Sequence, residues 1–130
     1  MRLHHVGLAV PSIEKAAEQY RQLFGFELTG SIVEDKAQKV RVAFAPVGGG
    51  VFVEFVEAAS DDSPVASLLK KGGGLYHLCF VVPDIERAVE HICRAGGRVV
   101  AAPQPAPAFD GRRIAFVYSP DRSLIEFLEE

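Results

Sequence analysis

The hydrophobic residues in the first half of the chain switch from the two-residue period of a strand to the spacing of a helix and back again. Residues 3–10 predict a strand. The next segment predicts a helix, because Ser12 is a suitable N-cap, Gly25 is a suitable helix stop, and the apolar residues between them follow one helical face. Three strand-like runs follow, near 26–33, 39–45 and 51–57. The predicted order is β-α-β-β-β.

This order of elements occurs twice, because the second half of the chain repeats the first with an offset of 72 residues. Leu3–Glu14 returns as Leu75–Glu86, and the offset is kept by two later pairs of segments, Arg41–Phe44 with Arg113–Phe116 and Glu54–Glu57 with Glu126–Glu129. In the second copy, Asp84 is the expected helix N-cap, Gly96-Gly97 end the helix, and strands are expected near 98–101, 112–118 and 123–129.

The repeat predicts an α+β fold of two tandem βαβββ modules. Module one spans residues 1–59, module two spans 75–130, and a connection at 60–74 carries a short helix near 65–70. Because neither module can bury its sheet alone, we expect the two four-stranded sheets to pair into one curved eight-stranded sheet within a single domain, residues 1–130.

Composition and charge narrow the function classes. With 130 residues and 48% hydrophobic content, the chain has material for a packed core, and a net charge of −3 without a basic run makes nucleic acid an unexpected partner. No apolar stretch has the length of a membrane span, and no signal region precedes the first strand, so we expect a cytoplasmic protein without membrane contact. Cys79 and Cys93 lack metal-binding spacing and are expected to be reduced packing residues.

Four metal-competent side chains are related by the same offset: His5 with His77, and Glu54 with Glu126. Each Glu has apolar neighbours on its own strand face, and a buried carboxylate needs a cation, a hydrogen-bond network, a shifted pKa or a metal. Two His and two Glu suit a divalent first-row metal in a cleft between the modules. The alternative is that the histidines are packing residues, the glutamates reach solvent, and duplication alone repeats them.

Other repeated charges have simpler interpretations. Arg41 and Arg113 are candidates for holding a substrate carboxylate or phosphate, although a surface charge on a strand is the favoured interpretation. Glu57 and Glu129 stand at strand ends, where we expect exposure. The Pro-rich segment 103–111 is expected to cross as a stiff, extended loop in which Phe109 is the anchor, either roofing a cleft or crossing the sheet edge.

With these residues and motifs, the chain resembles the vicinal oxygen chelate superfamily, which includes glyoxalases, bleomycin resistance proteins and dioxygenases. The resemblance covers nearly the whole length and implies that His5, Glu54, His77 and Glu126 bind a divalent metal. The segments His5–Val10, Asp62–Ala66 and Leu75–Leu78 are most similar to methylmalonyl-CoA epimerase and a related bacterial glyoxalase I-like group.

The resemblance implies an enzyme of enolate chemistry, an isomerase acting on an acyl thioester, with Glu54 and Glu126 moving the proton alpha to the carbonyl. Lactoylglutathione lyase activity on a thiol hemithioacetal and non-catalytic binding are the alternatives. Ala9 replaces an arginine of glyoxalase I, while Asp110-Gly111 and the short turn at 119–123 differ from the epimerases. Co²⁺ or Ni²⁺ is the expected metal, with Mn²⁺, Fe²⁺ or Zn²⁺ as alternatives, and a homodimer is expected. An acid from Glu34-Asp35 is a further candidate base.

Overall fold

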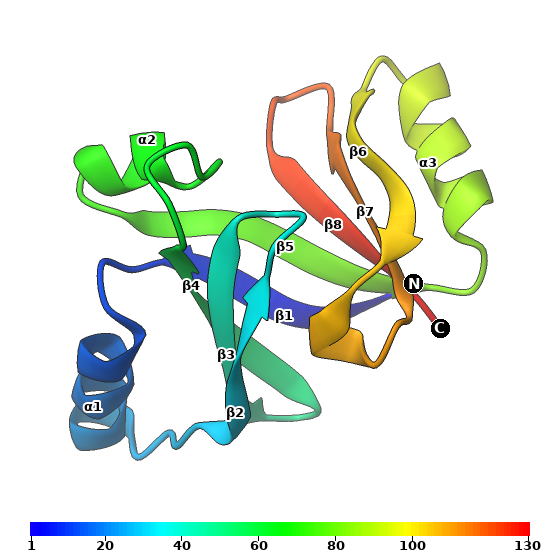
Figure 1. Ribbon diagram of the computed structural model, residues 1–130. Helices are drawn as coiled ribbons and strands as arrows, with labels where there is room; N and C mark the ends of the chain where they lie inside the picture. The colour runs from blue at the N-terminus through cyan, green and yellow to red at the C-terminus, as the bar shows by residue number, and fades with distance from the viewer. The chain divides into compact units, whose positions relative to one another are not determined.

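The computed structural model describes every residue from Met1 to Glu130 and divides into two compact units (Figure 1). The N-terminal unit comprises His5–Tyr76, and the C-terminal unit comprises Met1–His4 together with His77–Glu130. Each unit contains one copy of the sequence repeat, with the first residues of the chain grouped with the second copy.

The N-terminal unit contains the first β-α-β-β-β series. Its elements are β1 (Arg2–Ala9), α1 (Ile13–Phe24), β2 (Thr29–Asp35), β3 (Val40–Gly48), β4 (Val51–Ala58) and the short α2 (Ala66–Lys70). The strand order is β2-β3-β4-β1, with β1 parallel to β4 and the other neighbours antiparallel. The helix α1 packs against β3 and β4.

The C-terminal unit repeats this series. Its elements are β5 (Gly74–Val82), α3 (Ile85–Arg94), β6 (Arg98–Pro105), the short 3₁₀ helix η1 (Pro107–Phe109), β7 (Arg113–Tyr118) and β8 (Leu124–Glu129). The strand order is β5-β8-β7-β6, again with one parallel pair, β5 with β8. Figure 1 shows α3 beside this sheet, where it packs against β6, β7 and β8.

These series confirm the predicted α+β fold of two tandem βαβββ modules. The hydrogen-bonded strand order along the chain's eight strands is β2-β3-β4-β1-β5-β8-β7-β6. The strand β1 contributes its first residues to the C-terminal unit and the rest to the N-terminal unit.

The predicted helix caps are both present. The Ser12 side chain accepts a hydrogen bond from the Lys15 N–H at 3.2 Å, and the Asp84 side chain accepts one from the Arg87 N–H at 2.9 Å. Gly25 ends α1 with a φ of 73°, a left-handed conformation that glycine adopts without steric cost. Local sequence signals therefore set the bounds of α1 and the start of α3.

The core between helix and sheet is equivalent in the two units. In the N-terminal unit, Ile13 of α1 packs in a buried cluster with Phe55 of β4, and in the C-terminal unit Ile85 of α3 packs with Phe127 of β8. Ile13 and Ile85 are each 0% exposed. The opposite face of the C-terminal sheet has a second buried cluster, of Cys79, Val81, Ala106, Ile114, Phe116 and Leu128.

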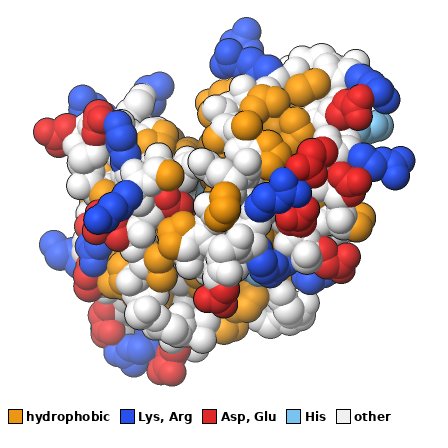
Figure 2. Space-filling model, turned by 45° about the vertical axis from the view of Figure 1, so that its right-hand side comes forward, with side chains coloured by type: hydrophobic (Ala, Val, Ile, Leu, Met, Phe, Trp, Pro, Cys, Tyr) orange, Lys and Arg blue, Asp and Glu red, His pale blue; other side chains and the backbone are white.

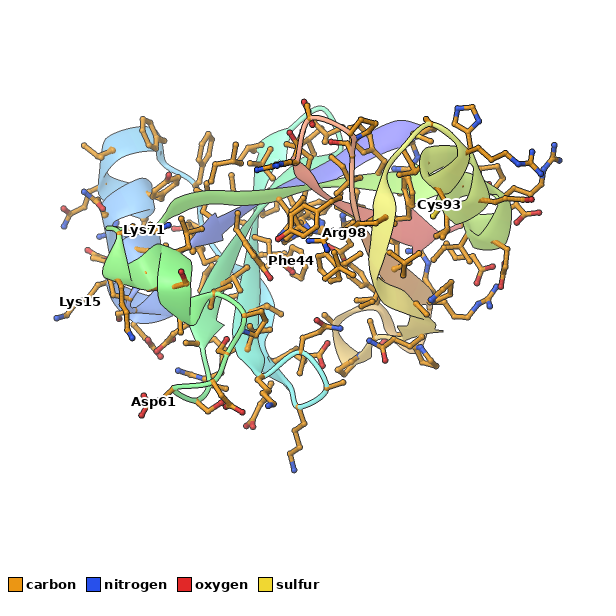
Figure 3. All side chains as sticks on the ribbon, turned by 90° about the horizontal axis from the view of Figure 1, so that it is seen from above. Lys15, Phe44, Asp61, Lys71, Cys93 and Arg98 are labelled. Carbon is orange, nitrogen blue, oxygen red and sulfur yellow. The ribbon has the colours of Figure 1, made fainter.

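Some element bounds and one burial expectation were wrong. The strand β2 begins at Thr29 rather than near residue 26, and β6 continues to Pro105 instead of ending near residue 101. Because β6 is an edge strand with irregular register, it tolerates prolines that lack an N–H donor. Cys79 is buried as expected, but Cys93 on α3 is exposed (Figure 3).

None of the chain's helices combines the length and the apolar character of a membrane span. On the face in Figure 2, acidic and basic side chains are interspersed, and hydrophobic side chains are exposed among them.

Candidate metal and catalytic site

The N-terminal unit brings His5 and Glu54 together. Their strands are parallel neighbours, and the register pairs Gly7 with Glu54, so His5, two residues before Gly7, lies on the same face as Glu54. The His5 Nε2 atom lies 3.5 Å from the Glu54 Oε1 atom. His5 is 0% exposed and Glu54 is 5% exposed.

The C-terminal unit brings His77 and Glu126 together in the same way. The parallel register of β5 and β8 pairs Cys79 with Glu126, so His77 shares the face of Glu126. The His77 Nε2 atom lies 2.9 Å from the Glu126 Oε2 atom, and both side chains are almost completely buried. The predicted site residues therefore form two equivalent His-Glu pairs, one in each unit.

Each histidine ring also contacts a phenylalanine that sequence reasoning did not select. His5 packs edge-on against Phe44 and His77 against Phe116, each with 5.4 Å between ring centroids. Phe44 and Phe116 are the cross-strand neighbours of Glu54 and Glu126. The signal was present, because the two phenylalanines are 72 residues apart. Their rings fix the imidazole orientation and supply an apolar wall beside each carboxylate.

The donor set fits a divalent metal. Each pair supplies one imidazole nitrogen and one carboxylate group, both buried and both of a kind that binds metal ions. Imidazole and carboxylate together suit first-row metals such as cobalt, nickel, manganese, iron and zinc. A buried carboxylate is costly unless a positive charge or hydrogen bonds compensate it, and a bound metal cation provides such a charge.

Arg113 is held by carboxylates of its own unit. Its guanidinium donates two hydrogen bonds to Glu129, at 2.8 and 2.6 Å, and two to Glu86, at 2.6 and 3.1 Å. The hydrogen bonds from Arg113 hold the pKa values of the Glu86 and Glu129 carboxyls below their usual range. This cluster joins the start of α3 to the start of β7 and the end of β8.

Arg41 occupies the equivalent place in the N-terminal unit. It donates to Glu57 at 3.0 Å and to Glu14 at 3.4 Å, so it joins the start of α1 to β3 and β4. Both repeated arginines are thus half-exposed structural charges, as the favoured interpretation expected. The expectation of simple exposure for Glu57 and Glu129 was wrong, because both are partly buried ion-pair partners.

The remaining candidate residues have local structural roles. Asp35 is at the end of β2 and accepts a hydrogen bond from the Gln38 N–H at 3.0 Å, so it stabilises the turn that follows, while Glu34 is exposed. Phe109 in η1 packs against the buried cluster of the C-terminal unit and against the His4 ring, with 5.5 Å between centroids. Phe109 packs as the expected anchor, and the covering of a cleft stays a prediction. The expectation that residues 103–111 form one extended loop was wrong, because β6 continues to Pro105 and η1 follows it.

Comparison with known proteins adds the family. Residues 4–116 match the family model described as the Glyoxalase/Bleomycin resistance protein/Dioxygenase superfamily. The ethylmalonyl-CoA/methylmalonyl-CoA epimerase of Cereibacter sphaeroides is 34% identical over 92% of this chain and 90% of its own length. The mitochondrial methylmalonyl-CoA epimerase of Bos taurus is 33% identical over 92% of this chain and 68% of its own length.

Solved structures agree with these relatives. The methylmalonyl-CoA epimerase of Mycobacterium tuberculosis is 28% identical, with a TM-score of 0.83 over 98% of this chain and 86% of that one. A variant of the Streptomyces coelicolor methylmalonyl-CoA epimerase, in complex with 2-nitronate-propionyl-CoA, is 29% identical, with a TM-score of 0.84 over 100% of this chain and 97% of that one. From its motifs, its paired modules and these matches, the chain belongs to the glyoxalase/bleomycin resistance protein/dioxygenase superfamily.

Proposed function

We propose that the chain is a divalent-metal-dependent epimerase that acts on an acyl-CoA thioester such as methylmalonyl-CoA. The observation that carries the proposal is the pair of equivalent, buried His-Glu pairs in a chain 34% identical to an ethylmalonyl-CoA/methylmalonyl-CoA epimerase. The relatives and the solved structures described above are named epimerases of acyl-CoA thioesters. This favours the epimerase over the lactoylglutathione lyase and the non-catalytic binding protein.

In this proposal His5, Glu54, His77 and Glu126 bind one metal ion. Their donor types, their burial and the 72-residue repeat that relates them support a shared role. When bound, the metal supplies Lewis-acid chemistry that lowers the energy of an enolate. Co²⁺ and Ni²⁺ are the proposed ions because a mixed imidazole and carboxylate set suits them, and Mn²⁺, Fe²⁺ and Zn²⁺ use the same donors.

The two carboxylates perform the proton transfer in this proposal. Epimerisation requires that a proton leave one face of the alpha carbon and that another arrive at the opposite face. Glu54 and Glu126 come from equivalent places in the two modules, so one accepts the proton and the other returns it. Because both are at most 5% exposed, bulk water competes poorly with them as base.

The Phe44 and Phe116 rings assist by excluding water beside the carboxylates. Each ring packs against a histidine of a pair and is the cross-strand neighbour of the glutamate. An apolar wall strengthens the electrostatic interactions that stabilise developing negative charge.

We further propose that the protein is a homodimer and that it is located in the cytoplasm. Sedimentation equilibrium tests the homodimer, and cell fractionation tests the location.

The deciding experiment measures exchange of the alpha proton. Purified protein is stripped of metal, reloaded with Co²⁺, Ni²⁺ or Zn²⁺, and incubated with methylmalonyl-CoA in deuterated water while proton NMR follows the alpha signal. We expect exchange in loaded samples and none in stripped samples, and metal analysis gives one ion per chain. Bound metal without exchange contradicts the epimerase and directs attention to methylglyoxal with a thiol; absence of bound metal contradicts the metal site.

A further inference from the structure

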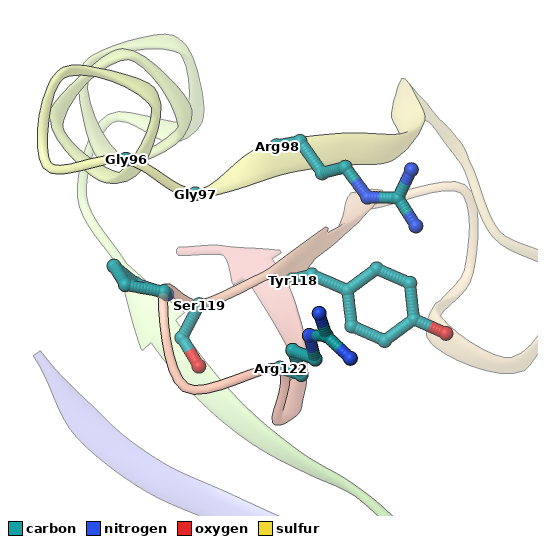
Figure 4. Close-up of a pocket in the computed structure, with 7 residues that line it drawn as sticks. Gly96, Gly97, Arg98, Tyr118, Ser119 and Arg122 are labelled. Carbon is teal, nitrogen blue, oxygen red and sulfur yellow. The ribbon is translucent and has the colours of Figure 1, made fainter.

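A pocket in the C-terminal unit lies outside the His-Glu pairs and is rich in positive charge (Figure 4). It has a volume of about 650 Å³ and is lined by the Gly96-Gly97 segment after α3, Arg98 at the start of β6, Tyr118 at the end of β7, and Ser119 and Arg122 of the following turn. All of these residues belong to one unit.

The two arginines of the pocket differ from Arg113 of β7 in their partners. Arg113 is fully engaged by carboxylates, whereas Arg98 and Arg122 form no ion pair. The Arg98 guanidinium carbon lies 5.1 Å from the centroid of the Tyr118 ring, so the ring stacks on the guanidinium. This stacking leaves the N–H donors at the edge of the guanidinium available for a ligand. Figure 4 shows the Arg98 and Arg122 side chains on the same side of the pocket as the Tyr118 ring.

The acid next to Arg122 in the sequence, Asp121, is hydrogen-bonded within the turn. Asp121 accepts a hydrogen bond from the Ser119 hydroxyl and another from the Ser123 N–H at 3.0 Å, so its carboxylate is used inside the turn. The pocket therefore carries two cations, and the only carboxylate of the 119–123 turn is engaged elsewhere. Such a concave, positively charged surface attracts anions.

The backbone positions both arginines at some conformational cost. A Cβ on Gly97 would lie 2.5 Å from the Tyr118 carbonyl oxygen, so only glycine allows this close approach that places Arg98 opposite Tyr118. Arg122 has a φ of 68°, a left-handed conformation that is uncommon for a residue other than glycine. Strained residues cluster at functional sites more than elsewhere.

The register places this pocket beside one His-Glu pair. Tyr118 lies two residues beyond Phe116 on β7, and Phe116 pairs with Glu126, so Tyr118 and Glu126 face the same side of the C-terminal sheet. Arg98 pairs with Tyr118 and shares that side. Two residues of strand span about 7 Å and neighbouring strands lie about 4.8 Å apart, so Arg98 on β6 begins two strands and two residues away from Glu126 on β8.

We propose that Arg98 and Arg122 bind the phosphate groups of the nucleotide portion of an acyl-CoA substrate, an inference that rests on the proposed function. Guanidinium groups bind phosphate oxygens through paired, charge-assisted hydrogen bonds. The position of the pocket along β7 orients the thioester end of the substrate toward Glu126. The arginines are thus binding residues that select a phosphorylated carrier over a short thiol.

The test measures nucleotide binding directly, without turnover. Adenosine 3′,5′-bisphosphate is titrated by calorimetry into metal-loaded parent protein, into the double variant Arg98→Gln with Arg122→Gln, and into Arg87→Gln. Arg87 is an exposed arginine of α3 outside the pocket and is the matched control. We expect the dissociation constant to rise at least about tenfold in the double variant only, and adenosine without phosphates to bind no variant measurably.

A second measurement links the pocket to the substrate. The KM for methylmalonyl-CoA should rise in the double variant, and the KM for the pantetheine thioester, which lacks the nucleotide, should change far less. Equal melting temperatures of the parent and the variant show that the fold is kept. Parental nucleotide affinity in the folded double variant overturns the inference. If alpha-proton exchange fails while arginine-dependent nucleotide binding persists, the proposed reaction is wrong and the phosphate site stands.

Discussion

Replacement of Glu126 with glutamine tests the two-base proposal most directly. Glutamine keeps the volume of the side chain but removes the group that accepts a proton. Glu126 is 2% exposed and lies 2.9 Å from the His77 Nε2 atom, so neither bulk water nor a mobile side chain takes its place. A positioned base contributes about 10²–10⁴-fold, and this burial places the expected loss of epimerisation at about 10³-fold, or about 4 kcal/mol.

The stereochemistry of exchange makes this prediction sharp. In Glu126→Gln, Glu54 still removes the alpha proton from one enantiomer, so deuterium enters that enantiomer without inversion while the other enantiomer is inert. Glu54→Gln should show the opposite preference. Proton NMR on each enantiomer of methylmalonyl-CoA in deuterated water measures both effects, with metal content determined on the same samples.

The strand β8 also carries a residue whose replacement is a matched control. Glu129→Gln, three residues further along the strand in the Arg113 ion pair, should leave epimerisation unchanged. If Glu126→Gln retains its metal and epimerises at more than about one-tenth of the parental rate, Glu126 is not a base. If both enantiomers stop exchanging in metal-loaded Glu126→Gln, the assignment of one carboxylate to each face is wrong.

Three further predictions concern stability. Ile13→Ala and Ile85→Ala should each lower the free energy of unfolding by about 2–5 kcal/mol in urea titrations, because both side chains are fully buried at equivalent places; a much smaller loss at one of them contradicts the equivalence of the two cores. Arg113→Gln should destabilise the protein above pH 4.5, the ordinary pKa of the two carboxyls it bonds. Those pKa values are lowered in the folded protein, so the stabilisation is complete above that pH and is lost as pH falls through the folded values; a constant difference from the parent between pH 7 and pH 3 in thermal melts refutes this. Gly97→Ala should cost about 1–3 kcal/mol, because its Cβ would lie 2.4 Å from an Ile92 methyl carbon, and unchanged denaturation midpoints contradict that contact.

The repeat let the sequence determine much of the fold and the chemistry. Local signals sufficed for the helices, because a cap such as Ser12 or Asp84 bonds within its own turn. The 72-residue offset identified both His-Glu pairs, because a residue type needed in both modules occurs at equivalent positions of the two copies. Strand limits were less certain, because a strand ends where its partner ends, as the extension of β6 to Pro105 opposite Arg113 shows.

Only the tertiary structure decided which residues that are distant in the chain come into contact. The parallel registers that place His5 beside Glu54, and His77 beside Glu126, join segments about 50 residues apart, which periodicity cannot align. The same holds for the ion pairs that occupy Arg113 and for the pocket that leaves Arg98 without a carboxylate. Residue type and spacing determined which chemistry the chain carries, and strand pairing decided which side chains meet, because through-space contacts depend on register rather than on sequence distance.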